Sequence, residues 1–164
     1  MNIRPEQPAD IDTIRALTRA AFANAPYSSQ TEAAIVDALR DAGALTLSLV
    51  AEDNGEVVGH VAFSPVTVGG DAGWYGLGPV SVWPESQSRG IGQSLIRHGL
   101  ETLRQIGAKG CVLIGDPAYY SRFGFVADPT VSYGDIPPEY VQRLAFGQHM
   151  ARGEIVYHAG FGAS

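Results

Sequence analysis

The sequence predicts a single α/β domain built around one mixed β-sheet. Three observations lead to this fold class: two amphipathic helical stretches come first, a β-hairpin signal follows, and a strand–helix–strand stretch with further short strands completes the chain. A chain of 164 residues has the size of one compact domain and can bury a substantial core. No repeat, linker or low-complexity segment interrupts it, so we expect one domain over residues 1–164.

The first elements are a short strand and two helices. The strand falls at Ile3-Arg4, and Asp10 then opens a helix. Its apolar residues recur at helical spacing: Ile11, Ile14, Leu17 and Ala21. After a polar turn, the residues from Ser29 to Glu32 have the form of a capping box for a second helix, which Gly43 should end. The apolar face of that second helix is narrow: Ala34, Ile35, Ala38 and Leu39.

A hairpin and a third strand are predicted next. The β-rich runs from Leu45 to Glu52 and from Glu56 to Ser64 flank an Asn54-Gly55 turn signal. The stretch from Val66 to Gly73 has the composition of a looser, glycine-rich connection. The strand from Trp74 to Val82 contains Gly78-Pro79, which predicts a bulge or a place where a ligand or another backbone comes close.

The second half of the chain begins with a helix. It runs from Gly90 to about Ile106 and should end at Gly107. Its predicted apolar face is Ile91, Leu95, Gly99, Leu103 and Ile106. A short apolar strand at 111–114 suits a central position in the sheet, and a short helix follows over 116–123. Two further strands are expected over 140–146 and 154–157.

Composition limits the function and the compartment. A net charge of −6 argues against nucleic-acid or anionic-membrane binding and favours cationic small partners such as amines. The single cysteine, Cys111, excludes an intrachain disulfide and is expected to be a buried, inert thiol. His98, His149 and His158 have no metal-ligand spacing, so no metal is expected. Without a signal-peptide pattern or a membrane-spanning apolar run, a cytoplasmic protein is expected.

The segment from Val80 to Leu95 carries the strongest functional signal. It should form a strand, a loop punctuated by Gly90 and Gly92, and the first turn of a helix. Backbone N–H groups and the positive end of a helix dipole then meet at one place, where a phosphate or pyrophosphate binds well. Arg89 adds a guanidinium suited to phosphate.

Two common phosphate-binding motifs fit this loop poorly. A P-loop needs a lysine after its last glycine, and none follows Gly92. A dinucleotide fingerprint needs a third glycine and an acidic residue about 20 positions later. Asp116 is suitably placed, but Leu95 occupies the position of the third glycine, and the N-terminal half supplies a hairpin rather than βαβ units. The dinucleotide interpretation is therefore a weak alternative.

The same loop resembles the cofactor motif of the GNAT superfamily of acetyl-CoA-dependent N-acetyltransferases. Residues 87–92, Gln-Ser-Arg-Gly-Ile-Gly, match its Q/R-x-x-G-x-G/A pattern, and Val80-Ser81-Val82 is similar to its cofactor strand. Residues 120–125, Tyr-Ser-Arg-Phe-Gly-Phe, resemble its Y-x-x-x-G-F segment. The strand Gly59–Pro65 and the run Pro117–Tyr120 resemble bacterial members whose activity is itself only predicted. The three motifs occur in the family's order, which makes their combination specific.

The resemblance implies a fold and a ligand. The sheet would be mostly antiparallel, flanked by helices, and splayed into a V-shaped cleft that holds acetyl-CoA as co-substrate. Backbone groups of Val80 and Val82 would pair with the pantetheine arm, and loop amides would cradle the pyrophosphate. The implied cofactor-binding residues are Val80, Ser81, Val82, Gln87, Ser88, Arg89, Gly90, Ile91, Gly92 and Gln93.

The resemblance also implies a reaction. The acetyl group would move to a primary amine by direct attack in a ternary complex, with the Val82 N–H stabilising the charged oxygen. Tyr120 occupies the position of the acid that protonates the leaving thiolate, and Tyr119 is the neighbouring alternative. Glu32 and His60 are candidate general bases, with water as a third option.

Other points stay open at this stage. A GNAT fold that binds acyl-CoA as a sensor or docking module without turnover is the alternative function. The acceptor, a small-molecule or peptide amine, should contact the segments 23–29 and 128–138, and neither identifies it. An exposed strand near the C-terminus would allow a homodimer.

Overall fold

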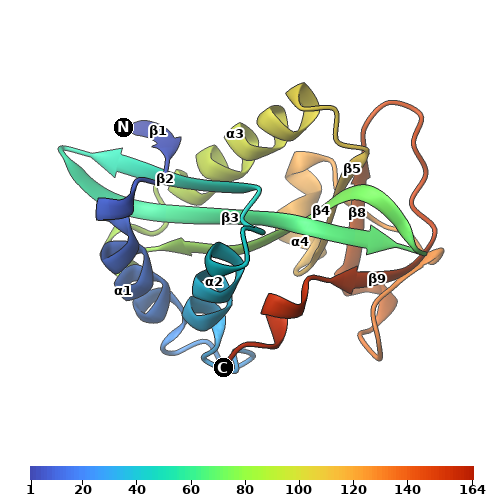
Figure 1. The fold of residues 1–164 in the computed structure, drawn as a ribbon, viewed down its shortest axis with the longest axis horizontal. Coiled ribbons are helices and arrows are strands. Elements are labelled where there is room, and N and C mark those ends of the chain that lie inside the picture. The colour runs from blue at the N-terminus through green and yellow to red at the C-terminus, as the bar shows by residue number, and fades with distance from the viewer. The chain divides into compact units, whose positions relative to one another are not determined.

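The computed structural model describes residues 1–164 and places helices and strands in nearly the expected order (Figure 1). The helices are α1 (Ile11–Phe22), α2 (Glu32–Asp41), α3 (Ile91–Gln105) and α4 (Pro117–Tyr120). The strands are β1 (Asn2–Pro5), β2 (Leu47–Asp53), β3 (Glu56–Val68), β4 (Asp71–Val82), β5 (Gly110–Ile114), β6 (Val126–Ala127), β7 (Val131–Ser132), β8 (Val141–Ala145) and β9 (Gly153–Tyr157). The sheet order is β1-β2-β3-β4-β5-β8-β6, and β9 pairs with β3 and β7. Because β4 and β5 are parallel while β1–β2, β2–β3 and β5–β8 are antiparallel, the predicted mixed sheet is confirmed.

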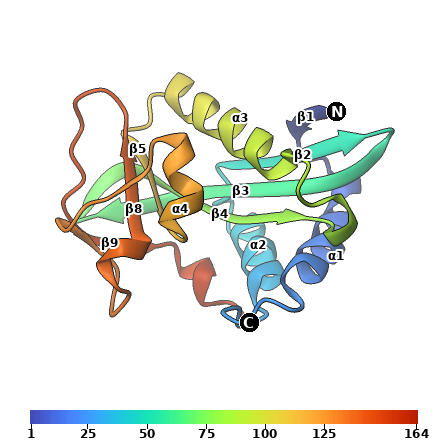
Figure 2. The same ribbon diagram turned by 180° about the vertical axis from the view of Figure 1, so that it is seen from behind.

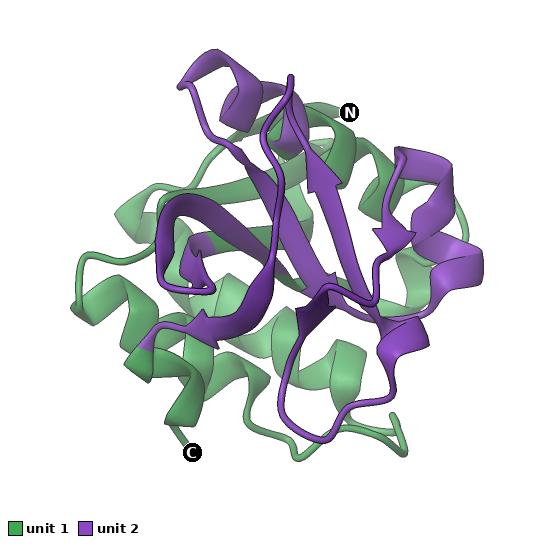
Figure 3. Cartoon of the chain, turned by 90° about the vertical axis from the view of Figure 1, so that its right-hand side faces the viewer, with its two compact units in different colours: residues 1–63, 78–99, 159–164 green, residues 64–77, 100–158 purple.

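The chain forms two compact units, shown in different colours in Figure 3. The first contains residues 1–63, 78–99 and 159–164, and the second contains residues 64–77 and 100–158. The first unit therefore contains the complete segment from Val80 to Gln93, whereas α4 belongs to the second.

In the first unit, the β2–β3 hairpin has the predicted turn. Asp53 pairs with Glu56, and Asn54 and Gly55 between them have φ values of +52° and +80°. Positive φ at both central residues is the conformation that favours an Asn-Gly sequence in two-residue hairpins. The turn fixes the register of the strands, apart from an irregularity at Ala51/Glu52, so that His60 pairs with Val50.

The two faces of β3 in the first unit pack against different helices. Val50, the partner of His60, clusters with Ile14 of α1 and Val36 of α2. On the opposite face, Gly99 of α3 lies so close to the Phe63 ring that any side chain there would overlap it. Figures 1 and 2 show α1 and α2 on one side of β2 and β3, and α3 on the other. His60 therefore faces α1 and α2.

Glycine ends α2 and α3 as predicted. Gly43 and Gly107 have φ values of +67° and +82°, which residues with a side chain rarely adopt. After α3, the Gly107 N–H donates to Arg104 O at 3.1 Å, and the Ala108 N–H donates to Leu103 O at 3.0 Å. This pair of bonds is a Schellman motif, which satisfies carbonyl groups that the helix leaves without partners.

Three expectations about helix starts and faces are wrong in whole or in part. The capping box at Ser29–Glu32 does not form, because Gln30 turns the chain with φ +62° and α2 begins only at Glu32. The Glu32 carboxylate instead accepts hydrogen bonds from Ser28 Oγ at 2.7 and 2.8 Å. Ile106 was the last residue of the predicted apolar face of α3. The helix ends one residue earlier, at Gln105, and Ile106 is 55% exposed. On α2, the predicted residues Ile35 and Leu39 are buried, whereas Ala34 and Ala38 are only partly so. Ala33 and Val36 complete the buried face instead.

The predicted loose connection between Val66 and Gly73 is also wrong. Strand β3 continues to Val68, β4 begins at Asp71, and only the two glycines between them turn the chain. The end of β3 pairs with β9, from Val66 with Tyr157 to Val68 with Ile155. Glycine content suggested a loop, but this pairing with a distant strand stabilises extended backbone.

The second unit has its own core and two strands that were not predicted. Eight buried residues form this core: Val66, Val68, Trp74, Val112, Val131, Val141, Ala151 and Ile155. Strands β6 and β7 have two residues each, too few for a periodic pattern in the sequence. The predicted irregularity in β4 at Gly78 is present, because this residue has φ +128° within the strand.

Candidate functional site

The loop between β4 and α3 leaves a set of backbone amides without helical partners. The first hydrogen bond of α3 runs from Ser94 N to Gly90 O at 3.0 Å. The amides of Ile91, Gly92 and Gln93 therefore have no acceptor within the helix, and they carry the positive end of its dipole. Anions bind readily at such a helix start.

Two left-handed residues shape the loop before the helix. Ser88 has φ +65° and Gly90 has φ +79°. A Cβ added to Gly90 would meet no atom within 4 Å, so the absent side chain leaves open space beside the free amides. Arg89 is exposed between these two residues. This arrangement fits a pyrophosphate, which needs close approach to backbone N–H groups and gains from a nearby guanidinium.

The strand before the loop presents backbone groups for a ligand. Trp83 N donates to Val58 O at 3.1 Å, which fixes the alignment of the end of β4 beside β3. Backbone groups alternate in direction along a strand, so those of Val80 and Val82 point away from β3. Gln87 Nε2 donates to Val82 O at 3.1 Å and ties the loop to the strand end. Of the predicted cofactor residues, 80–82 thus end β4, and 87–93 form the loop and the first turn of α3.

His60 lies on the strand beside this segment. The hydrogen bond from Trp83 to Val58 brings Ser81 to the level of His60, since antiparallel strands advance in opposite directions. A Cβ added to Gly59 would lie 3.3 Å from Ser81 O, in agreement with this alignment. His60 is fully buried, and Ser81 is 2% exposed. His60 Nδ1 and Ser81 Oγ both lack a hydrogen-bond partner.

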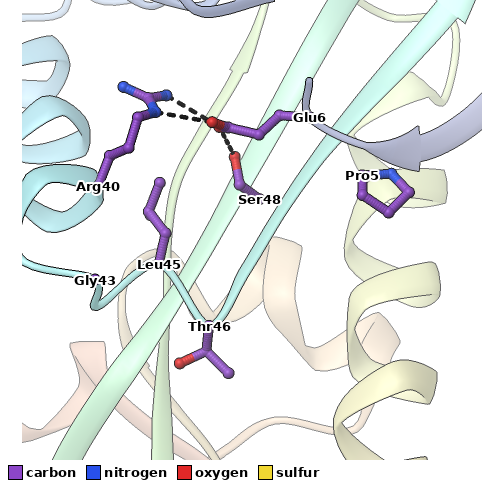
Figure 4. Close-up of a pocket in the computed structure, with 7 residues that line it drawn as sticks. All are labelled: Pro5, Glu6, Arg40, Gly43, Leu45, Thr46 and Ser48. Carbon is purple, nitrogen blue, oxygen red and sulfur yellow. Dashed lines mark hydrogen bonds and ion pairs between the residues drawn. The ribbon is translucent and has the colours of Figure 1, made fainter. Parts of the chain in front are cut away.

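The other nitrogen of His60 begins a polar chain that the sequence analysis missed. His60 Nε2 lies 2.8 Å from Ser48 Oγ, and Ser48 Oγ in turn contacts Glu6 Oε1. Arg40 donates to both Glu6 oxygens, at 2.8 and 3.0 Å (Figure 4). Arg40 also donates to Asp37 at 3.0 Å. The hairpin register could have predicted this neighbour. Ser48 pairs with Ala62, and Ala62 lies on the same face of β3 as His60 because the two residues are two positions apart.

A pocket of about 340 Å³ opens at this polar chain. Figure 4 shows its lining residues, which come from the end of β1, the end of α2 and the segment entering β2. They are Pro5, Glu6, Arg40, Gly43, Leu45, Thr46 and Ser48. Glu6 and Ser48 therefore connect the buried imidazole with a hollow in the surface.

Burial and charge set the protonation of the cluster. Burial lowers the pKa of His60 to about 4; the Glu6 carboxylate opposes this shift, and the Arg40 guanidinium adds to it. Burial raises the pKa of Glu6, but hydrogen bonds from Arg40 and Ser48 outweigh it, so the net shift of that pKa is downward. At neutral pH, His60 is uncharged and Glu6 is ionised.

The pKa of His60 predicts acid destabilisation. Between about pH 6.5 and 4, the unfolded chain binds a proton at His60 that the folded protein does not, so stability falls as the pH falls. We expect the free energy of unfolding to drop from pH 7 to pH 5 by about 2 kcal/mol more in the wild type than in His60→Gln. Urea denaturation at both pH values measures this difference. Equal drops in the two proteins would show that burial does not depress the pKa of His60.

Tyr120 lies on α4, in the second unit. Its ring packs edge-on to Tyr119, with centroids 4.9 Å apart, and contacts Phe123 and Phe125 with centroids 6.2 Å apart in each case. Because Gly115 has no side chain, the Tyr120 ring can also lie against its backbone. These contacts fix the direction of the ring, and the two neighbouring tyrosines point differently.

The remaining candidate residues have simple surroundings. Glu32 is half-buried at the start of α2 and bonds to Ser28, so it is not part of the His60 cluster. Cys111 is buried, as predicted, and burial raises its thiol pKa far above neutral pH.

No group of three or more His, Cys, Asp or Glu side chains is arranged to hold a metal ion. None of the helices combines the length and the apolar character needed to cross a membrane.

Comparison with known proteins identifies the family. Residues 2–127 match the model of the acetyltransferase (GNAT) domain, and the chain belongs to the GNAT acetyltransferases. Over 127 residues it is 46% identical to the uncharacterized N-acetyltransferase YhbS of Escherichia coli. That alignment covers 76% of this chain and 73% of YhbS. The predicted resemblance is therefore confirmed.

Two solved structures are similar over nearly the whole chain. A GNAT family acetyltransferase from Brucella melitensis in complex with acetyl-CoA is 56% identical, with a TM-score of 0.87 and coverage of 98% of this chain and 97% of that one. YhbS from Escherichia coli in complex with CoA is 36% identical, with a TM-score of 0.89 and coverage of 98% and 91%. Both confirm the predicted fold class, a mostly antiparallel mixed sheet flanked by helices.

Proposed function

We propose that this protein transfers an acetyl group from acetyl-CoA to a primary amine by direct attack in a ternary complex. The observation that carries the proposal is the segment from Val80 to Gln93. It combines outward-facing strand groups, open space beside Gly90 and free amides at the start of α3. Membership of the GNAT family and the relatives crystallised with acetyl-CoA and CoA support the same ligand.

The segment would bind acetyl-CoA along its length. Val80 and Val82 would hydrogen-bond the pantetheine arm as a neighbouring strand would. The amides of the loop and of the first helical turn would hold the pyrophosphate, with Arg89 adding charge. The acetyl group would then lie near Ser81, the strand neighbour of His60. We infer that residues 1–164 act together as one catalytic domain in the cytoplasm.

Acetyl transfer sets three chemical requirements. The amine must lose a proton before it attacks, because an alkylammonium has a pKa of about 10.4. Charge on the thioester oxygen must be stabilised, for which the Val82 N–H is our candidate. The leaving thiolate gains from an acid, for which Tyr120 is the candidate. Among the proposed bases, His60 is supported by its neutral, buried imidazole beside the cofactor strand. Glu32 has no such support.

The function is tested by binding and turnover with one preparation. Isothermal calorimetry measures acetyl-CoA affinity, and a thiol reagent detects CoA release across a panel of amino acids, polyamines, aminoglycosides and peptide N-termini. We expect binding, and thiol release with at least one amine. Initial-velocity lines that intersect would support a ternary complex, whereas parallel lines would indicate an acetylated enzyme.

The same panel separates the alternatives. Tight acetyl-CoA binding without acetylation of any amine would favour an acyl-CoA sensor or docking module. Absence of acetyl-CoA binding would contradict both interpretations. A change in NADH fluorescence on mixing would favour the dinucleotide interpretation instead.

A further inference from the structure

The contacts around Ser48 determine where the hydrogens of the buried cluster lie. The Glu6 carboxylate is ionised and accepts both hydrogen bonds from Arg40, so it can only accept from Ser48 as well. Ser48 has one hydroxyl hydrogen, and two oxygens in contact need a hydrogen between them. That hydrogen therefore lies between Ser48 Oγ and Glu6 Oε1.

This assignment fixes the tautomer of His60. Because the Ser48 hydrogen is directed at Glu6, Ser48 Oγ can only accept from His60 Nε2 across their 2.8 Å contact. The neutral imidazole then has its hydrogen on Nε2 and a lone pair on Nδ1. Nδ1 has no hydrogen-bond partner and is buried, as is Ser81 Oγ on the adjacent strand.

We propose that Glu6 and Ser48 are positioning residues that hold His60 as its Nε2–H tautomer and so present Nδ1 as the base toward the acetyl-transfer site. The proposal rests on the acetyltransferase function proposed above. In the step, one N–H bond of the acceptor ammonium breaks, an Nδ1–H bond forms, and the amine keeps the electron pair with which it attacks the thioester. The imidazolium then holds one hydrogen on each nitrogen.

A nearby charge offsets part of the burial that disfavours a charged His60 in this transfer. The nearest opposite charge is Glu6, at the end of the first strand, which stabilises the imidazolium through Ser48. Arg40 of α2 opposes it, but Arg40 is itself paired with Glu6 and Asp37, and Asp37 is paired with Arg15 of α1. Glu6 and Ser48 also line the surface pocket, so the carboxylate that faces the imidazolium lies at a hollow in the surface.

Nuclear magnetic resonance tests the tautomer without turnover. In protein labelled with ¹⁵N-histidine, we expect His60 to give a neutral Nε2–H pattern with a slowly exchanging proton, assigned by its loss in His60→Gln. Ser48→Ala removes the acceptor, so this proton should shift and exchange faster. Ser48→Thr keeps a hydroxyl and should restore it. An Nδ1–H tautomer in the wild type would overturn the proposal.

Kinetics test the positioning role with acetyl-CoA and the best amine of the panel. Ser48→Ala should lower kcat by about tenfold or more, part of the 10² to 10⁴ that a general base contributes, and leave acetyl-CoA affinity unchanged. Ser48→Thr should recover most of the rate. Glu6→Gln should lower kcat because it removes the charge that stabilises the imidazolium. Asp12→Asn, which breaks the exposed Arg15–Asp12 ion pair of α1 without touching Arg40, Glu6 or Ser48, is the control and should retain the wild-type kcat.

The outcomes separate this proposal from the proposed function. If Ser48→Ala and Glu6→Gln keep full kcat while the wild type acetylates amines, the positioning role is wrong and the acetyltransferase function stands. If no amine is acetylated, the base role fails with the proposed function, whereas the NMR data still decide the tautomer. A reduced kcat that Ser48→Thr does not recover would point to disturbed packing and count against the proposal.

Discussion

Tyr120→Phe is expected to lower kcat by about 10²- to 10⁴-fold while acetyl-CoA affinity stays unchanged. The substitution removes only the phenol hydroxyl, the proposed proton donor to the departing thiolate, and general acid catalysis contributes a factor of this size. Ring contacts with Phe123 and Phe125, both at centroid distances of 6.2 Å, remain available to phenylalanine. Single-turnover measurements with saturating acetyl-CoA would isolate the chemical step.

Tyr119→Phe is the matched control for this prediction. It removes the same hydroxyl from the adjacent residue, whose ring lies at 87° to that of Tyr120 and stacks under the Arg122 guanidinium at 4.5 Å. We expect it to retain the wild-type kcat. The reverse result, with Tyr119→Phe slow and Tyr120→Phe fast, would transfer the acid role to Tyr119. Two fast variants would leave solvent as the proton source.

Gly90→Val is expected to weaken acetyl-CoA binding by at least about 100-fold. At φ +79° the valine side chain would fill the open space beside the amides of Ile91, Gly92 and Gln93. A pyrophosphate kept away from these groups loses several charge-assisted hydrogen bonds, each worth about 1.5–3 kcal/mol. Calorimetric titration with acetyl-CoA measures the loss.

Gly107→Val separates this effect from backbone strain. Gly107 ends the same helix, has a similar φ of +82°, and also has open space where a Cβ would lie. Both substitutions place a β-branched residue in the left-handed region, at a cost of about 1–2 kcal/mol in stability. Only Gly90→Val should impair acetyl-CoA binding. Equal affinity of both variants and the wild type would contradict the proposed pyrophosphate site.

Local signals explain which parts of the site the sequence could predict. The loop from Gln87 to Gln93 and the Asn54-Gly55 turn are short segments whose glycines and turn residues determine their own backbone conformation. The backbone conformations predicted for these two segments were confirmed, because no distant contact is needed to form them. The strand that ends at Val82 could be predicted for the same reason, since it directly precedes the loop.

Two expectations failed for different reasons, one because of a distant segment and one because of a local turn. The glycine-rich stretch after Val66 is strand because β9, about 90 residues later, pairs with it. Glu32 does not complete a capping box because the left-handed Gln30 delays the start of the helix. The failure at Glu32 is thus local, whereas the composition after Val66 was compatible with two structures that only the pairing with β9 distinguishes.

By itself, the sequence determined the mixed α/β fold class, the conformation of the glycine-containing loop before α3 and membership of the GNAT family, because the signals for each lie in contiguous residues. Only the tertiary structure decided the surroundings of His60. Glu6, Arg40 and Ser48 come from the end of one strand, a helix and a second strand, and they meet because β1, α2 and β2 pack together. Burial then makes the imidazole neutral, and the hydrogen bond of Ser48 to Glu6 selects its tautomer. No pattern of residue types along the chain records either effect.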